Sequence, residues 1–399
     1  MTAIDGSRVA ATPELGGETA ERGVSPVELL WDLVFVFAIT QVGALLARDL
    51  TWSGLGHAAL LLALVWWAWS AYVWVANSLD VDSLALQLTL VTGLVLVGVN
   101  GLAIPSAFGA QGALFAATYV AVRLMHLGLY AASARQGNAS WEAIAGFAST
   151  VVIGMVLLLV GSLLPGAARV GLWTAAAVID YAGPLLTRRR LRGLQHVAVA
   201  HFAERYGAFI IICLGESVAA IGVTASRLAI TPGLVAVVAL GLVVTACLWW
   251  EYFRDEAGAA AARLREHAEP VLAGSDAYSY LHLVLVAGII LFAVGMRHVL
   301  VDAALGNAVP FYEEHLSDGA RAACCGGLAL FLAGDLAVGA RLLGMVRYRA
   351  LVAAGALLVV LAISGTWPGW AVVAASAAIL VALCVAGELL RARESGGTA

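Results

Sequence analysis

Two acidic side chains stand one helical turn apart near the start of the first long apolar run of this sequence. Glu28 and Asp32 are four residues apart, so in a helix they share one face. Carboxylates placed in this way can carry protons, or they can pair with a cation on another helix. Glu28 also suits a capping role, because the N-terminus of a helix favours negative charge. Asp32 lies one turn deeper in the helix. A functional role and a structural ion pair are both open interpretations for this residue.

A second polar stripe crosses a later apolar run. Tyr119, Arg123, His126 and Tyr130 are spaced by four, three and four residues and so lie on one helix face. Because an arginine does not neutralise itself by losing a proton, Arg123 needs a carboxylate or water beside it. An interhelical ion pair that fixes packing and a contact to a substrate would both explain this arginine. The candidate partners are the acidic residues of other apolar runs: Asp32, Asp180 and Glu216.

The segment from His201 to Ser217 is the most informative. Arg205 and Glu216 are eleven residues apart, which returns to nearly the same helix face but separates them by about 16 Å along the axis. We therefore expect no direct pair, and Glu216 is the strongest candidate for a protonatable functional residue. His201 and Glu204 could ligate a metal at i and i+3, but no further ligands accompany them, so we expect neither a metal nor a cofactor.

The composition places these groups in a membrane protein. The 399 residues are 62% apolar and 12% charged, whereas soluble chains are roughly 45–50% apolar and about 25% charged. The apolar runs are continuous rather than alternating, which predicts helices and not a β-barrel. The net charge of −4 gives no basic surface for nucleic acid, and all 22 basic residues are arginines, which excludes lysine chemistry.

The apolar runs predict an all-α integral membrane protein with about twelve spans of roughly 20 residues each. An even number of spans places both termini on one side. If that side is the cytoplasm, most arginines fall in cytoplasmic segments, as the positive-inside rule requires. The run Arg188, Arg189, Arg190 and Arg192 anchors the middle of the chain there. We predict an N-in and C-in orientation.

Similar segments six spans apart predict two parallel six-helix repeats. The run from Leu86 aligns with the run from Leu281, which places Gly93 opposite Gly288. The predicted organisation is a disordered cytoplasmic tail at 1–23, a first half at 24–187, an Arg-rich cytoplasmic linker at 188–200, a second half at 201–390 and a cytoplasmic tail at 391–399.

Two of these segments resemble the signatures of a known family. ELLWDLVFVFAI at 28–39 and the segment 201–217 look like the bacterial low temperature requirement protein A (LtrA) family, and Arg123 with Asn77, Asp80 and Asp82 fits the same pattern. The resemblance covers about 24 to 390 and implies a multi-pass protein of the bacterial cytoplasmic (inner) membrane. It implies little chemistry, because the family's activity is poorly defined. The segment 28–39 is also distantly similar to the first helix of six-plus-six-helix potassium channels.

Our leading functional hypothesis is a transporter or channel for a small solute or ion. Its polar pathway would be lined by the intramembrane ionisable groups and their neighbours at the helix ends: Glu28, Asp32, Arg123, His126, Asp180, His201, Glu204, Arg205 and Glu216. The alternatives are a membrane-embedded enzyme acting on a lipid or isoprenoid and a non-catalytic scaffold or sensor. The expected partners are the lipid bilayer and that solute, with no nucleic acid, and a homodimer is left open.

Overall fold

The computed structural model describes residues 24–76, 79, 83–137, 141–187, 199–256, 262–264, 266–305 and 315–396. Within these ranges the regular elements are helices, apart from an isolated β-bridge between His315 and Pro368. The predicted all-helical fold is confirmed. The long helices are α1 (Pro26–Leu46), α2 (Trp52–Ala76), α3 (Leu84–Ala103), α4 (Gly112–Arg135), α5 (Trp141–Ser162), α6 (Gly166–Leu186), α8 (Val199–Ala225), α9 (Pro232–Trp250), α12 (His282–Leu305), α14 (Gly327–Leu343), α15 (Tyr348–Ile363) and α16 (Gly369–Gly396).

Eleven helical stretches of the described chain are long and apolar enough to cross a membrane. The remaining long helix, α6, has 21 residues and packs along α5, but it carries Arg169 and Asp180 and is less apolar. The prediction of about twelve membrane-spanning helices agrees with this arrangement.

Short helical turns extend several of these helices. They are η1 (Ile104–Ser106), η2 (Glu251–Glu256), α11 (Pro270–Gly274), η3 (Ser275–Leu281), α13 (Asp318–Arg321), η5 (Ala322–Gly326) and η6 (Ser364–Thr366). The turns η2, η3 and η5 are π-helical, a geometry that often marks functional segments. Of these, η3 leads directly into α12 and, as described below, lines a cavity.

Local sequence explains where several helices begin and end. Proline stands at the first position of both α1 and α9 (Pro26 and Pro232), where its missing N–H costs no helical hydrogen bond. Before α9, Thr231 Oγ1 accepts a hydrogen bond from Leu234 N at 3.1 Å. At the other end of a helix, Gly344 adopts the left-handed conformation (φ 66°) that closes α14.

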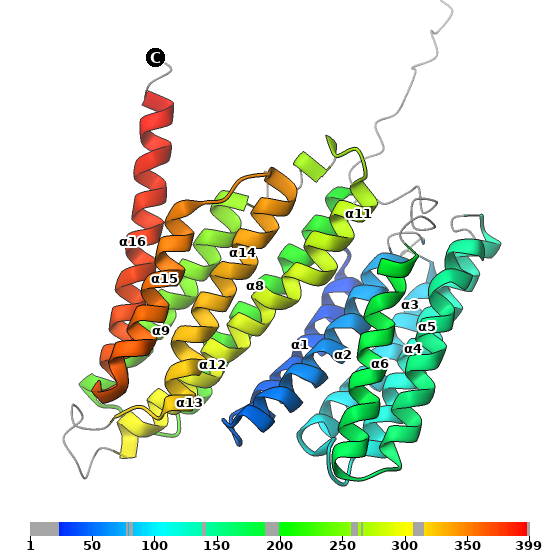
Figure 1. Cartoon of the computed structure of the whole chain (residues 1–399), viewed down its shortest axis with the longest axis horizontal. Helices are drawn as coiled ribbons and strands as arrows, with labels where there is room; N and C mark the ends of the chain where they lie inside the picture. Colours follow the sequence, from blue (N-terminus) through cyan, green and yellow to red (C-terminus); the bar gives the residue numbers. More distant parts are fainter. Residues whose placement is uncertain are drawn as a thin grey trace, which may run out of the picture.

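The helices fall into two groups that follow the order of the chain. Figure 1 shows α1 to α6 on one side of the molecule and α8 to α16 on the other, with α1 and α2 next to the second group. Helix α1 packs against α8 and α12, and α2 also contacts both of them. These four helices form the junction between the two groups.

Glycine allows a close approach between α12 and α14. A Cβ atom on Gly288 would lie 2.7 Å from the carbonyl oxygen of Gly327 and 2.6 Å from the backbone nitrogen of Phe331. Only glycine fits so close to another backbone. This contact holds α12, and with it η3, in a fixed position relative to the rest of the second group.

Candidate functional site

An arginine of α8 binds two carboxylates of α1. Arg205 donates from Nη1 to Glu28 Oε1 at 2.6 Å and from Nη2 to Asp32 Oδ1 at 2.5 Å. His201, one turn earlier on α8, places Nε2 3.3 Å from Glu28 Oε2, and Trp69 of α2 donates its indole N–H to Asp32 Oδ1 at 2.8 Å. The residues of this Arg205 cluster are buried. Because its charges come from both groups of helices, the cluster ties the two groups together.

Next to this cluster, hydroxyl groups and indoles form a second connection between α2, α8 and η3. Tyr206 Oη lies 2.7 Å from Ser70 Oγ and 3.2 Å from Ser279 Oγ, and Ser70 donates to Ser279 Oγ at 2.9 Å. Trp74 donates to the same Ser279 hydroxyl at 2.8 Å, and Trp66 donates to the Ser279 carbonyl at 2.7 Å. Ser279 is therefore the hub of this network, and it lies in a π-helical turn.

A second arginine is buried within the first group of helices. Arg123 of α4 donates from Nη2 to both carboxylate oxygens of Asp180 of α6, at 2.8 and 2.9 Å. The other two guanidinium nitrogens, Nε and Nη1, are buried and have no hydrogen-bond partner among the described residues. His126, one turn further along α4, is 2% exposed, and neither of its ring nitrogens has a partner of normal hydrogen-bond geometry there.

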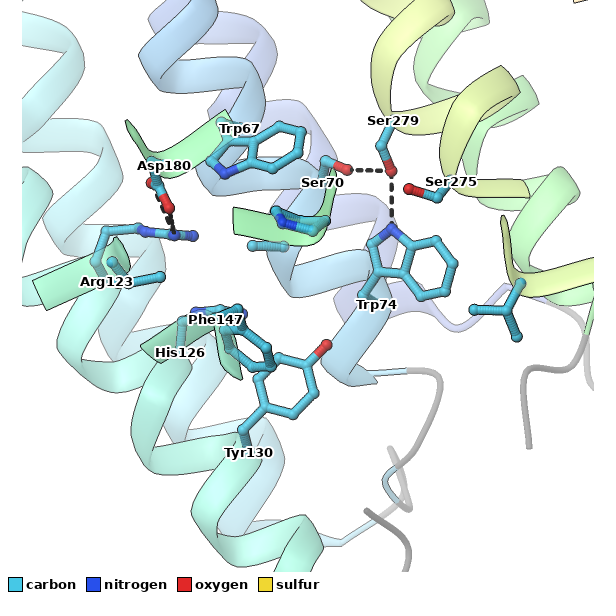
Figure 2. Close-up of a pocket in the computed structure, with 14 residues that line it drawn as sticks. Trp67, Ser70, Trp74, Arg123, His126, Tyr130, Phe147, Asp180, Ser275 and Ser279 are labelled. Atoms are coloured by element: carbon cyan, nitrogen blue, oxygen red, sulfur yellow. Dashed lines mark hydrogen bonds and ion pairs between the residues drawn. The ribbon is translucent and has the colours of Figure 1, made fainter. Parts of the chain in front are cut away.

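These unpartnered groups line a cavity of about 70 Å³ that we call the first cavity. Figure 2 shows Arg123 and His126 on one side of it and Ser70, Ser275 and Ser279 on the other. Aromatic rings and apolar side chains complete the wall: Trp67, Trp74, Tyr130, Phe147, Val151, Pro184 and Val271. The first cavity is thus lined by α2, α4, α5 and α6 of the first group and by α11 and η3 of the second.

A larger cavity, of about 400 Å³, lies between α1, α8 and α12, and we call it the second cavity. Glu216 lines it, half-buried and facing Thr40, and Arg297 lies on the same wall. A further pocket of about 290 Å³ shares Ala44 and Arg297 with the second cavity and extends it toward His298. The second cavity therefore follows the C-terminal halves of α1 and α8 and the middle of α12.

Comparison with known proteins now gives the family. The family of the bacterial low temperature requirement A protein (LtrA) matches residues 23–385. The chain belongs to the LtrA family. An uncharacterized protein of Rhizobium meliloti (strain 1021) is 31% identical to it over 318 residues, which are 77% of this chain and 75% of that relative. No solved structure gives a significant match. The resemblance inferred from the segments 28–39 and 201–217 is confirmed.

In this LtrA chain, eight of the nine predicted site residues lie in three places. Four of them form the Arg205 cluster: Glu28, Asp32, His201 and Arg205. Three surround the first cavity: Arg123, His126 and Asp180. Glu216 is the one predicted site residue that lines the second cavity.

Glu204 is exposed, although it lies within one turn of buried His201. The two side chains therefore do not face a common site, and no cluster of metal ligands occurs in the described part of the chain. The Asn77, Asp80 and Asp82 group lies outside the described residues, as do 188–198 of the Arg-rich linker.

A third charge cluster lies in the second group of helices, and spacing along the sequence did not predict its arginine partners. Arg347, just before α15, forms ion pairs with Asp335 of α14 and, at 3.5 Å, with Glu251 at the start of η2. Arg349 lies 3.7 Å from the same Glu251 oxygen. Both acidic residues are buried. The only available signal was an acidic residue inside each of two apolar runs, which requires a cation from elsewhere.

Proposed function

We propose that this LtrA-family protein is a transporter that moves a small polar solute across the membrane by alternating access. The observation that carries the proposal is the pair of cavities at opposite ends of the helix bundle. The first cavity is lined by the C-terminal halves of α2, α4 and α6 and by the start of the α11 to α12 segment. The second is lined by the C-terminal halves of α1 and α8 and by the middle of α12. Neighbouring helices alternate in direction, so these lining segments lie toward different membrane surfaces.

The side chains between the cavities support this proposal. Along α8, Tyr206 bonds to serines of the first cavity, Cys213 lines the second, and Phe209 lies between them. Phe209 packs on Trp69 at 3.9 Å between ring centroids and on Trp66 at 5.7 Å. This aromatic layer and the neighbouring Arg205 cluster close the route between the cavities. A transporter needs such a barrier, whereas an open pore does not.

The order of helix contacts supports a repeat whose two halves could move against each other. In the first group, α1 packs on α2 and α3, α3 on α4, and α2 on α6. In the second, α8 packs on α9 and α12, α12 on α14, and α9 on α16. The same scheme of neighbours after six long helices favours two parallel halves, a design in which substrate sites lie at the interface of the repeats.

The orientation also belongs to this proposal. In the described chain, Arg135, Arg254, Arg347, Arg349 and Arg391 lie near the end of the bundle where α4, α9, α14 and α16 finish. A positive end favours a cytoplasmic position. The first cavity would then open toward the cytoplasm, with both termini on that side of the bacterial cytoplasmic membrane.

Two matched alanine-to-cysteine variants test alternating access. Ala71 lines the first cavity and Ala220 the second, and both are half-buried. In membrane vesicles of known orientation, a membrane-impermeant maleimide should label Ala71→Cys from one side only and Ala220→Cys from the opposite side only. The wild-type chain supplies the background from its native cysteines. Labelling of both variants from the same side, or of either from both sides, would contradict the proposal.

A further inference from the structure

The first cavity presents buried hydrogen-bond donors that have no acceptor among the described residues. Arg123 is 1% exposed and uses only Nη2 on Asp180, so Nε and Nη1 lack partners within the described chain. Leaving a buried charged donor unpaired carries the full cost of removing that donor from water. A guest in the cavity that offers an oxygen acceptor would remove this cost.

The volume of the first cavity limits the size of that guest. A cavity of about 70 Å³ is roughly half the size of one that accepts benzene. A molecule of about four heavy atoms fits, and an aromatic acid does not. The walls suit a guest that has one polar and one apolar end, because Trp74 lies across the cavity from Arg123, and the rings of Tyr130 and Phe147 lie beside His126.

Charge balance narrows the chemistry further. Arg123 and Asp180 already neutralise each other, so an anion entering the cavity would bring an uncompensated buried charge, which is costly. His126 borders the same cavity, and among the described residues neither ring nitrogen has a partner of normal hydrogen-bond geometry, although the ring lies near the backbone of Ala71. Beside a bound anion, an imidazole nitrogen is a site for a proton. The charged and titratable groups around His126 are Arg123 and Tyr130 on α4, Tyr72 on α2 and Asp180 on α6. An anion and one proton entering together leave the site neutral.

We propose that the first cavity binds a short-chain monocarboxylate of acetate size together with one proton. The carboxylate accepts hydrogen bonds from an unpartnered nitrogen of Arg123, and His126 holds the proton. This inference rests on the proposed transport function, because it names the class of substrate that the first cavity would carry. Its test uses binding alone, so that it can fail independently of transport.

Saturation-transfer NMR of the acetate methyl group, with the purified full chain in detergent, measures this binding directly. We expect a saturable acetate signal, with acetamide bound at least about tenfold more weakly because it lacks the charge. Benzoate should give no signal from this site because of its size. A pH indicator in weakly buffered solution should report the uptake of about one proton for each acetate bound.

Three variants locate the site. Arg123→Gln combined with Asp180→Asn removes both charges and leaves no buried carboxylate stranded, and it should weaken acetate binding at least about tenfold. His126→Gln should abolish the proton uptake. Arg227→Gln, which changes an exposed arginine elsewhere, should leave both readouts unchanged.

Absence of acetate binding to the wild type, equal binding of acetamide, or full binding by the double variant would each overturn the carboxylate assignment. Proton uptake that persists in His126→Gln would overturn the role of the histidine. If acetate binds but the two cysteine variants are labelled from one side, the transport proposal fails and the binding site stands. If the labelling is sided and acetate does not bind, only the substrate class is wrong.

Discussion

The two arginines at the centre of this molecule, Arg205 and Arg123, are equally buried but have very different surroundings. Arg205 has a carboxylate on each terminal nitrogen, and those carboxylates receive further bonds from Trp69 and Ser25. Its Nε and Asp32 Oδ2 have no partner among the described residues, but Arg205 lines neither of the two cavities. Arg123 has one carboxylate on one nitrogen and faces a cavity with the rest of its guanidinium.

The difference separates two uses of buried charge. A charge whose partners all come from the protein holds helices together, and its removal leaves the partners stranded. A charge with unpartnered donors beside a cavity is placed to receive something from outside. By this criterion the Arg205 cluster joins the two groups of helices, and the Arg123 site is the better candidate for binding.

Arg205→Gln should have the largest effect on stability. The substitution strands both Glu28 and Asp32 in a buried position, and breaking a buried ion pair typically costs about 3–5 kcal/mol. We expect little folded protein, measured as the monodisperse fraction after heating in detergent. Arg227→Gln is the exposed control. A melting temperature equal to that control would show that the cluster does not hold α1 to α8.

Arg123→Gln should cost less, about 3 kcal/mol, because it strands only Asp180. Adding Asp180→Asn should restore most of the stability, since a neutral pair can bond to itself or to water in the cavity. The measurement is the melting temperature of the single and double variants. If the double variant is as unstable as the single one, the Arg123 pair is itself a structural element and the contrast with Arg205 disappears.

Trp69→Phe and Trp74→Phe compare a bond to a charge with a bond to a hydroxyl. Trp69 donates to the Asp32 carboxylate and Trp74 to the Ser279 hydroxyl. Phenylalanine keeps an aromatic ring in each place. Hydrogen bonds to charged groups contribute about 1.5–3 kcal/mol and neutral ones about 0.5–1.5. Trp69→Phe should therefore lower the melting temperature more, and the reverse order would argue against a central role for the Arg205 cluster.

Ser25→Ala should give the smallest loss, about 1 kcal/mol. It removes the Oγ donor that lies 2.9 Å from Glu28 Oε2, while the backbone N–H of residue 25 still donates to the same oxygen at 2.9 Å. Thermal unfolding should show a small shift with an unchanged elution profile. A loss of stability as large as that of Arg205→Gln would mean that the N-terminal cap of α1, and not the ion pairs, determines the stability of the cluster.

Sequence spacing predicted the helices well and the contacts between them only in part. The apolar runs and their lengths are enough to predict long membrane helices, because lipid leaves a backbone few other solutions. The sequence predicted that Arg123 needs a carboxylate partner, and Asp180 was one of the three candidate partners. The separation of Arg205 from Glu216 also followed from helix geometry, since the rise per residue sets the distance between two side chains on one helix face.

Other features could not be read from spacing. Asp32 was a candidate partner for Arg123, but it pairs with Arg205, because α1 packs against α8. The cluster of Arg347 with Asp335 and Glu251 joins residues from three elements. The order of residues along one helix does not determine which of its faces packs against which neighbouring helix.

Composition, periodicity and two short motifs are enough to establish the class of this protein, the approximate extent of its helices, its family and the charges that must find partners in an apolar medium. These properties are local to one helix or one segment. Which charges meet a carboxylate and which face a cavity depends instead on how α1, α2, α4, α6, α8 and η3 pack around one another. This packing affects stability, because in an apolar environment every buried donor that is left without an acceptor costs free energy.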